Sequence, residues 1–103
     1  MRIYGLKTCD TCRKAAKGLN AAMQDIRAEP LNPDQIDQFL AAFGEALVNR
    51  RSTTWRGLTE AEREMPPKQL LERHPTVMKR PVIEDATGAL YLGWGSDVKA
   101  RLL

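Results

Sequence analysis

The feature that most constrains this chain is a pair of cysteines, Cys9 and Cys12, at the point where a short apolar run gives way to an amphipathic segment. Residues 2–4 predict a strand, Gly5 marks a turn after it, and the amphipathic segment predicts a helix. The first turn of a helix has unpaired backbone N–H groups and partial positive charge, and both stabilise a thiolate. Two thiols at such a junction therefore predict a dithiol redox site.

The helical pattern after this junction assigns different roles to the two thiols. From Asp10 to about Met23, apolar residues recur with the spacing of one helical face. These residues are Ala15, Ala16, Leu19, Ala22 and Met23. Cys12 belongs to the same inward face, whereas Cys9 precedes the helix body. We therefore expect Cys9 to be the exposed nucleophile and Cys12 to be the partly buried resolving thiol.

Length and composition limit the classes of protein to which the chain can belong. A chain of 103 residues predicts one domain with a core that needs no disulfide or metal. The net charge of +3 is too small to predict direct binding of nucleic acid. No apolar run is long enough for a membrane span and no export leader is recognisable, so we expect a cytoplasmic protein. We also expect it to be a monomer. In the reducing cytoplasm a Cys-x-x-Cys pair is catalytic or redox-sensing rather than structural.

The middle of the chain, about residues 33–78, predicts a helical insertion. Three helical segments are expected there. They begin at Pro33, Thr59 and Pro67, and the last is halted by His74 and Pro75. Asn32 is the expected cap of the first helix and Gly44 its stop. Residues 49–58 have no clean period and predict a functional loop.

The remaining segments complete a mixed α/β pattern. Strands are predicted at residues 26–29, 81–84 and 89–92, the last two joined as a hairpin by residues 85–88, and Ser96 is the expected cap of a final helix. This order predicts a thioredoxin-like (glutaredoxin-like) fold, in which helices flank a small mixed β-sheet. The whole chain, residues 1–103, would form a single domain, with the helical insertion between the second and third strands.

Basic residues concentrate in two places that are candidates for anion binding. Arg50, Arg51 and Arg56 fall in the predicted loop, and Lys79 and Arg80 precede a proline. Guanidinium groups are the usual choice where an oxyanion must be held by two parallel hydrogen bonds. A solvated basic face, or arginines in surface salt bridges, would produce the same pattern.

Three segments resemble the arsenate reductase (ArsC)/Spx/YffB family, in order and over nearly the whole chain. They are residues 9–15 (CDTCRKA), 51–56 (RSTTWR) and 79–83 (KRPVI). The resemblance implies a thioredoxin-like fold with a helical insertion and a catalytic Cys9. It also implies oxyanion-binding arginines at Arg51 and Arg80, the latter followed by a proline, Pro81, that is usually cis in the family.

One departure separates the chain from the arsenate reductases of this family. They carry a third anion-binding arginine after the hairpin, where this chain has Gly93. The pattern is closer to the YffB and Spx branches, which places arsenate in doubt as the physiological substrate. The Cys-x-x-Cys pair resembles Spx, whose members bind the RNA polymerase α subunit, whereas Trp55 and the C-terminus resemble YffB.

Several of these candidate site residues could instead have a purely structural role. The two cysteines could be small buried apolar residues, and a zinc site would need a dimer because His74 is the only histidine. Arg13 is a further anion-binding candidate whose charge would help to hold Cys9 ionised, but it could equally belong to the solvent face of the first helix. Trp55 and Trp94 are expected to be packing residues, and no catalytic role is assigned to His74.

These observations predict a thiol–disulfide oxidoreductase. A Cys9 thiolate would attack the substrate, Arg51 and Arg80 would hold its anionic oxygens, and Cys12 would close a Cys9–Cys12 disulfide. Glutathione or a thioredoxin-type partner would be the reductant, with no bound cofactor or metal. One alternative is a redox-sensing transcriptional regulator that binds RNA polymerase, and a second is an arsenate reductase.

Overall fold

The chain divides into two units, which are described separately here. The computed structural model describes residues 1–103. Residues 1–29 and 80–103 form the first, which we call the thiol unit because it contains both cysteines. Residues 30–79 form the second, the helical unit. The helical unit is thus inserted in sequence between two halves of the thiol unit.

The thiol unit is built on a four-stranded mixed sheet with the order β2-β1-β3-β4. The strands are β1 (Arg2–Gly5), β2 (Ala22–Asp25), β3 (Val82–Glu84) and β4 (Leu90–Leu92). β1 runs parallel to β2 and antiparallel to β3, and β3 runs antiparallel to β4. This arrangement is the small mixed sheet that the sequence predicts.

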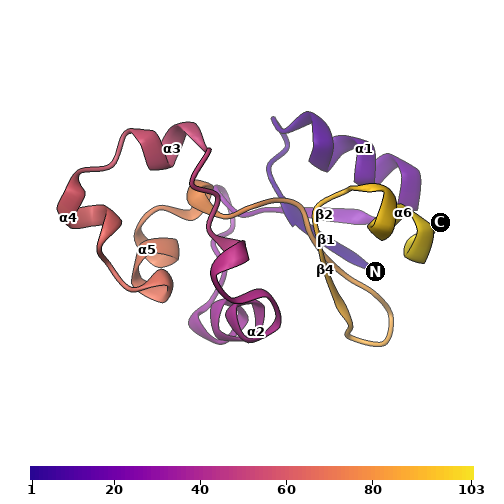
Figure 1. The fold of residues 1–103 in the computed structure, drawn as a ribbon. Helices are drawn as coiled ribbons and strands as arrows, with labels where there is room; N and C mark the ends of the chain where they lie inside the picture. The colour runs from indigo at the N-terminus through magenta and orange to yellow at the C-terminus, as the bar shows by residue number, and fades with distance from the viewer. The chain divides into compact units, whose positions relative to one another are not determined.

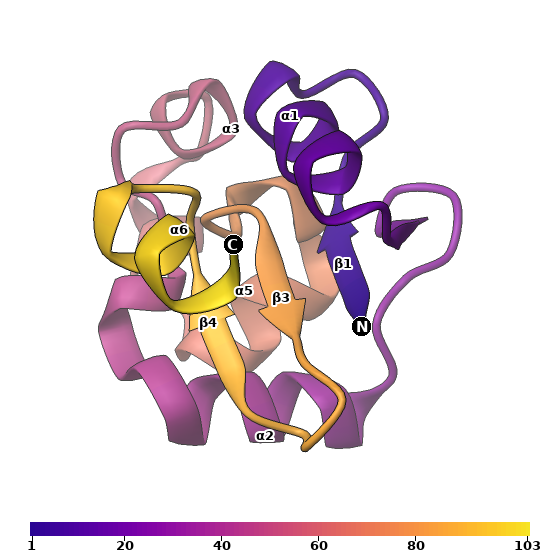
Figure 2. The same ribbon diagram turned by 90° about the vertical axis from the view of Figure 1, so that its right-hand side faces the viewer.

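Two helices, α1 (Asp10–Leu19) and α6 (Ser96–Leu102), pack on one face of this sheet (Figure 2). Their contact with the sheet is a core cluster of Ile3, Ala15, Ile83 and Val98, one residue from each of β1, α1, β3 and α6. Burial of such side chains contributes about 25 cal/mol per Å² of apolar surface. The cluster therefore fixes the start of α1, and with it the cysteines, against the end of β1.

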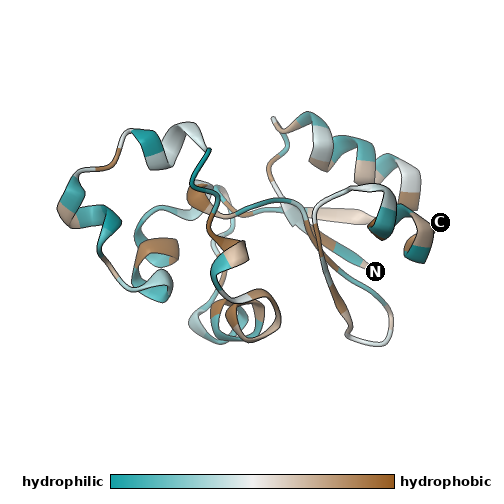
Figure 3. Ribbon diagram, in the orientation of Figure 1, coloured by the Kyte–Doolittle hydropathy of each residue, from teal (hydrophilic) through white to brown (hydrophobic).

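The helical unit consists of short helices joined by tight turns (Figure 1). They are α2 (Pro33–Phe43), the 3₁₀ helix η1 (Gly44–Leu47), α3 (Thr53–Arg56), α4 (Glu60–Arg63), α5 (Pro67–Arg73) and the 3₁₀ helix η2 (Pro75–Val77). α2 packs on α5, and both carry apolar residues that are buried (Figure 3). Capping boxes start two of the helices, Asn32 with Gln35 at α2 and Thr59 with Glu62 at α4.

Most predicted helix boundaries in this unit agree with the structure. Asn32 caps α2, and Gly44 ends it with a φ of 58°. The loop predicted at residues 49–58 is more ordered than expected, because it contains α3, which Ser52 caps through a hydrogen bond from the N–H of Trp55. None of the helices in the structure has the length and apolar character needed to cross a bilayer.

The predicted second strand is wrong in position. The first helix ends at Leu19 rather than near Met23, because Asn20 adopts a left-handed conformation with a φ of 48°. Residues 22–25 then form β2, so the strand begins four residues before the predicted range, 26–29. The carboxylate of Asp25 accepts hydrogen bonds from the N–H groups of Arg27 and Ala28 and turns the chain away from the sheet.

Each C-terminal element begins within one residue of its predicted start. The hairpin of β3 and β4 forms as predicted, with its turn closed by Asp85, which accepts hydrogen bonds from the N–H groups of Thr87 and Ala89. The final helix is preceded by Gly95 as its capping residue, so that Ser96 is the first helical residue rather than the cap.

Candidate redox site

The two cysteines lie at the start of α1 and differ in exposure. Cys9 is the residue that immediately precedes the helix, and its carbonyl oxygen accepts the first helical hydrogen bond, from the N–H of Arg13, at 3.0 Å. Its own N–H donates to the carbonyl of Leu6 at 3.0 Å. Cys9 is half-buried, whereas Cys12 is completely buried, with 0% of its surface exposed. Both are free thiols in the structure.

The pKa of Cys9 is lowered from the ordinary value for a thiol. Partial burial opposes its ionisation, but interactions with the backbone N–H and the thiol of Cys12 outweigh it, together with a hydrogen bond and the charge of Arg80. Arg80 is therefore the charged side chain that stabilises a Cys9 thiolate. This is the environment expected of a reactive cysteine.

The environment of Cys12 acts in the opposite direction. The pKa of Cys12 is raised to about 12, and burial is the main cause. A hydrogen bond with the Leu6 backbone lowers this pKa by a smaller amount, the Cys9 sulfur raises it, and the charge of Arg80 lowers it. The two thiols are three residues apart in sequence, yet one is poised to ionise and the other to stay protonated. Burial is the main cause of this difference.

Arg80 is held at the start of β3 by a distinctive backbone. The Arg80–Pro81 peptide bond is cis, and the carbonyl of Pro81 accepts a hydrogen bond from the N–H of Gly93 at 2.8 Å. Gly93 has a φ of 86°, and no heavy atom outside its chain neighbours lies within 4 Å of where its Cβ would be. Gly93, to which the resemblance assigns the third arginine of arsenate reductases, therefore has open space beside it and a backbone that favours glycine.

Arg13 makes a local ion pair on the surface of α1. Its guanidinium contacts the carboxylate of Asp10, and a second nitrogen lies 3.5 Å from the carbonyl oxygen of Lys7. Both partners of the ion pair are more than half exposed. Its predicted role in anion binding remains a prediction, and any such role requires Arg13 to share its charge with Asp10.

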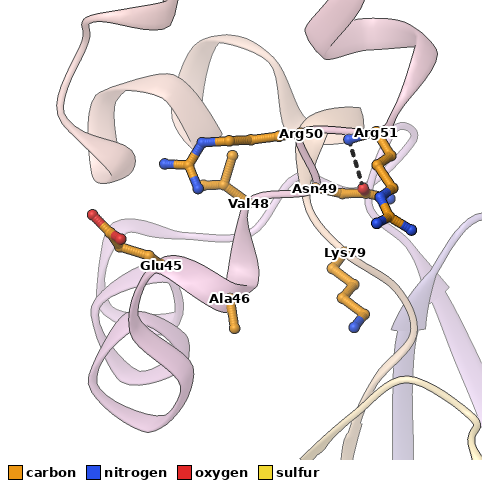
Figure 4. A pocket seen from close by; sticks show the side chains of 7 residues that line it. All are labelled: Glu45, Ala46, Val48, Asn49, Arg50, Arg51 and Lys79. Atoms are coloured by element: carbon orange, nitrogen blue, oxygen red, sulfur yellow. Dashed lines mark hydrogen bonds between the residues drawn. The ribbon is translucent and has the colours of Figure 1, made fainter.

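All three arginines of the predicted loop belong to the helical unit, and two of them, Arg50 and Arg51, line a pocket there. The pocket has a volume of about 570 Å³ and includes Arg50, Arg51 and Lys79 with one acidic residue, Glu45. Figure 4 shows Arg50 extending from the backbone in a different direction from Arg51 and Lys79. None of the three cationic side chains forms an ion pair. With three cationic side chains and one acidic one, the pocket carries net positive charge.

The two tryptophans are packing residues. In the helical unit, the guanidinium groups of Arg50 and Arg63 lie 5.4 and 5.7 Å from the centre of the Trp55 ring. In the thiol unit, Trp94 packs against the core cluster, and Gly18 of α1 leaves room for its ring. Cation–π contacts of this kind stabilise a fold by about 0.5–1 kcal/mol at exposed sites.

His74 has a structural partner. Its Nε2 lies 2.9 Å from a carboxylate oxygen of Glu62 and so joins the end of α5 to α4. No group of three or more His, Cys, Asp or Glu side chains in the structure is arranged to hold a metal ion.

Sequence reasoning missed the contribution of Gly5. This residue is the last of β1, not a turn, and a Cβ at its position would lie 2.4 Å from the Sγ of Cys12. The signal that could have revealed it is a glycine at the end of a buried strand, directly before a helix that carries a buried cysteine. In that setting a glycine marks the close approach of another group.

Comparison with known proteins places this geometry in a family. Residues 4–100 match the ArsC family. An uncharacterized protein of Haemophilus influenzae is 38% identical in an alignment of 91 positions, which covers 79% of this chain and 80% of that protein. The global transcriptional regulator Spx of Bacillus subtilis is 29% identical in an alignment of 112 positions, gaps included, which covers 98% of this chain and 85% of Spx.

Solved structures share the fold. A YffB protein superimposes with a TM-score of 0.84 and 27% identity, over 99% of this chain and 97% of the other. This likeness confirms the predicted thioredoxin-like fold. With the match over nearly the full length, it shows that the chain belongs to the ArsC family, in which Spx and YffB proteins are its relatives.

Proposed function

We propose that this protein is a thiol–disulfide oxidoreductase in which Cys9 is the nucleophile and Cys12 the resolving thiol. The observation that carries the proposal is the opposite shift of the two pKa values, downward at Cys9 and upward to about 12 at Cys12. Only a thiolate attacks a disulfide at an appreciable rate. At neutral pH Cys9 is therefore the thiol that reacts with the substrate.

The proposed reaction has two steps, formation of a mixed disulfide and its resolution. The Cys9 thiolate attacks one sulfur of a substrate disulfide, forms a mixed disulfide and releases the other half as a thiolate. Cys12 then loses its proton to solvent and attacks the Cys9 sulfur, which forms the Cys9–Cys12 disulfide and releases the second thiolate. The protein loses two electrons and the substrate gains them. Glutathione or a thioredoxin-type protein returns two electrons and regenerates both thiols.

The order of these steps is supported by the coupling between the sulfurs. While Cys9 is a thiolate, its charge and its hydrogen bond help to keep Cys12 protonated. Once Cys9 is in a mixed disulfide that charge is gone, so part of what holds the pKa of Cys12 high is removed. Cys12 thus becomes easier to ionise at the stage when its attack is needed.

The arginines are assigned to the anionic groups of the substrate. Arg80 stabilises the Cys9 thiolate and is the first candidate to hold an oxyanion beside it. Arg51, in the positively charged pocket of the helical unit, is the second candidate, and Arg13 is the third.

Because both thiols must be reduced between turnovers, we assign the protein to the cytoplasm.

A panel assay tests this proposal. The reduced protein is given arsenate, a mixed disulfide of glutathione, or an artificial disulfide, each with glutathione or with thioredoxin and its reductase. We expect turnover of at least one disulfide, and none by the Cys9→Ser variant. Equal activity of the Cys9→Ser variant would reject Cys9 as the nucleophile.

The relationship to Spx supports a second candidate, a redox-sensing regulator that binds the RNA polymerase α subunit. In that case the same disulfide would be a switch rather than a catalytic intermediate. Purification of the tagged protein from its own cells distinguishes the two, because only a regulator of this type would retain the α subunit. Membership of the ArsC family makes arsenate reduction a third candidate function. The absence of a side chain at Gly93 disfavours it.

A further inference from the structure

The seven glycines differ in how much space their surroundings would leave for a Cβ atom, and Gly5 has the least. At Gly5 that atom would lie 2.4 Å from the Sγ of Cys12 and 3.0 Å from its Cβ, whereas no other glycine has a neighbour below 3.0 Å. The space that an alanine methyl group would need is therefore already filled by the thiol of Cys12.

Neither partner of this contact is free to move away. Gly5 is held in the parallel ladder opposite Asp25, and its carbonyl oxygen accepts a hydrogen bond from the N–H of Ile26 at 2.9 Å. Cys12 is fully buried, and one turn further along α1 Ala15 is locked in the core cluster. Rotation of the Cys12 side chain would move the Sγ away but leave the Cβ of Cys12 at 3.0 Å, and it would displace the thiol from its position beside Cys9.

We infer that Gly5 is the positioning residue of the dithiol, because the lack of a side chain there admits the Cys12 sulfur into the space over the end of β1 and holds it beside Cys9. The inference rests on the proposed function, in which Cys12 must attack the Cys9 sulfur. It goes beyond that function by naming the residue that sets the depth and direction of the resolving thiol. Gly5 itself touches no reacting atom of the substrate.

The test uses the reagent 5,5′-dithiobis(2-nitrobenzoate), which reports both steps by the release of coloured thiolate. Attack by Cys9 releases the first equivalent, and closure of the Cys9–Cys12 disulfide releases the second. In the Gly5→Ala variant we expect closure to be about 10- to 100-fold slower, because a displacement of about 1 Å can cost that much in a reaction between positioned groups. At a pH where Cys9 is fully ionised, the first step should change by less than about threefold.

A matched control is Gly57→Ala in the helical unit. A Cβ at Gly57 would make ordinary contacts, at 3.6 and 3.7 Å, and the φ of −82° suits alanine. We expect both steps to be unchanged in this variant. A Gly5→Ala variant with the closure rate of the wild type would overturn the inference while leaving the proposed function intact.

A second measurement separates positioning from a general effect on folding. The apparent pKa of Cys9, followed by thiolate absorbance, should rise in Gly5→Ala and in Cys12→Ala, because both displace the thiol that stabilises the Cys9 thiolate. In the double variant it should equal that of Cys12→Ala alone. Additive shifts would contradict the inference, since Gly5 would then act on Cys9 independently of Cys12.

The design also covers a variant that fails to fold. If Gly5→Ala is unfolded and the double variant with Cys12→Ala is folded, the clash with the sulfur is confirmed as the cause. If both are unfolded, Gly5 serves the strand rather than the thiol, and the inference is rejected. A wild-type protein that releases only the first equivalent would count against the proposed function, whereas the pKa comparison would still test the contact of Gly5 with Cys12.

Discussion

The thiol unit and the helical unit both carry groups suited to chemistry, but they prepare these groups in different ways. In the thiol unit the reactivity of a side chain depends on packing, since burial is the main cause of the high pKa of Cys12. In the helical unit Arg50, Arg51 and Lys79 line an open pocket without an ion-pair partner. Substitutions at the buried thiol should therefore alter fold and reactivity together, whereas substitutions at the three pocket cations should alter binding alone.

The largest effect on the reaction with a disulfide is expected when each cysteine is replaced by serine on its own. Cys9→Ser should lower the rate of reaction with a disulfide by at least about 1,000-fold, because a serine hydroxyl is not ionised at neutral pH. Cys12→Ser should keep the first step and stop at the mixed disulfide, with one equivalent of thiolate released. Stopped-flow absorbance and mass spectrometry of the intact protein distinguish these outcomes. Trapping by the Cys9→Ser variant instead would reverse the assigned roles.

The next effect concerns arsenate. The resemblance to the family implies that the site has one charge-assisted hydrogen bond fewer than an arsenate reductase, because Gly93 carries no guanidinium. Such a bond contributes about 1.5–3 kcal/mol, which corresponds to roughly 10- to 150-fold in anion affinity. We expect no robust turnover at micromolar arsenate in an assay that follows oxidation of glutathione. Efficient turnover would make arsenate reduction the better account.

A third prediction concerns stability at alkaline pH. Cys12 keeps its proton in the folded protein up to about pH 12, whereas in the unfolded chain it loses the proton near its ordinary value of 9.0. Between these values the unfolded state binds fewer protons, so stability falls as the pH rises, by up to about 1.4 kcal/mol per unit. Chemical unfolding of the reduced protein between pH 8 and pH 11 measures this slope.

The matched control for this prediction is Cys12→Ala, in which that contribution disappears. Cys9 adds no slope above its ordinary pKa, because it is then ionised in both states. Its lowered pKa adds stability at lower pH, appearing as the pH rises through the folded value and complete above 9.0. Identical pH profiles for wild type and Cys12→Ala would show that burial does not hold the Cys12 proton.

The smallest effect is expected in the helical unit. Arg51→Ala should change the free energy of unfolding by less than about 0.5 kcal/mol, because its side chain forms no ion pair and lies at the surface. If Arg51 binds the substrate anion, KM for an anionic disulfide should rise about 1.5- to 5-fold, as for an exposed charge pair. KM for a neutral disulfide should not change. Arg27→Ala, an exposed arginine of the thiol unit, is the control.

The same contrast explains what could be predicted from the sequence. The start of α1, the caps at Asn32 and Thr59 and the hairpin around Asp85 depend on local residues, and the sequence predicts them correctly. The prediction misplaced β2 because the spacing of Ala22 and Met23 fits a helical face, and this pattern was given more weight than Asn20, a residue that favours the left-handed end of a helix.

The features of the site that the sequence did not predict depend on how closely neighbouring elements pack. The Cys-x-x-Cys motif and its position before a helix are visible in the sequence, and so is the asymmetry between the two thiols. The contact of Gly5 with Cys12 depends on how closely α1 crosses the end of β1, which no pattern encodes. The ion pair of Arg13 with Asp10 competes with the expected role of Arg13, and its i,i+3 spacing on the first helix is a local signal that could have been used.

The central claim is that hydrogen bonds and the charge of Arg80 make Cys9 reactive, while burial keeps Cys12 protonated. It is tested most directly by measuring alkylation of each cysteine as a function of pH. The reduced protein is treated with iodoacetamide from pH 5 to pH 10, and the modified peptides are quantified by mass spectrometry. We predict that Cys9 reacts first, with an apparent pKa below that of an ordinary thiol, and that Cys12 stays unmodified throughout. Preferential labelling of Cys12, or equal rates at the two thiols, would contradict the account.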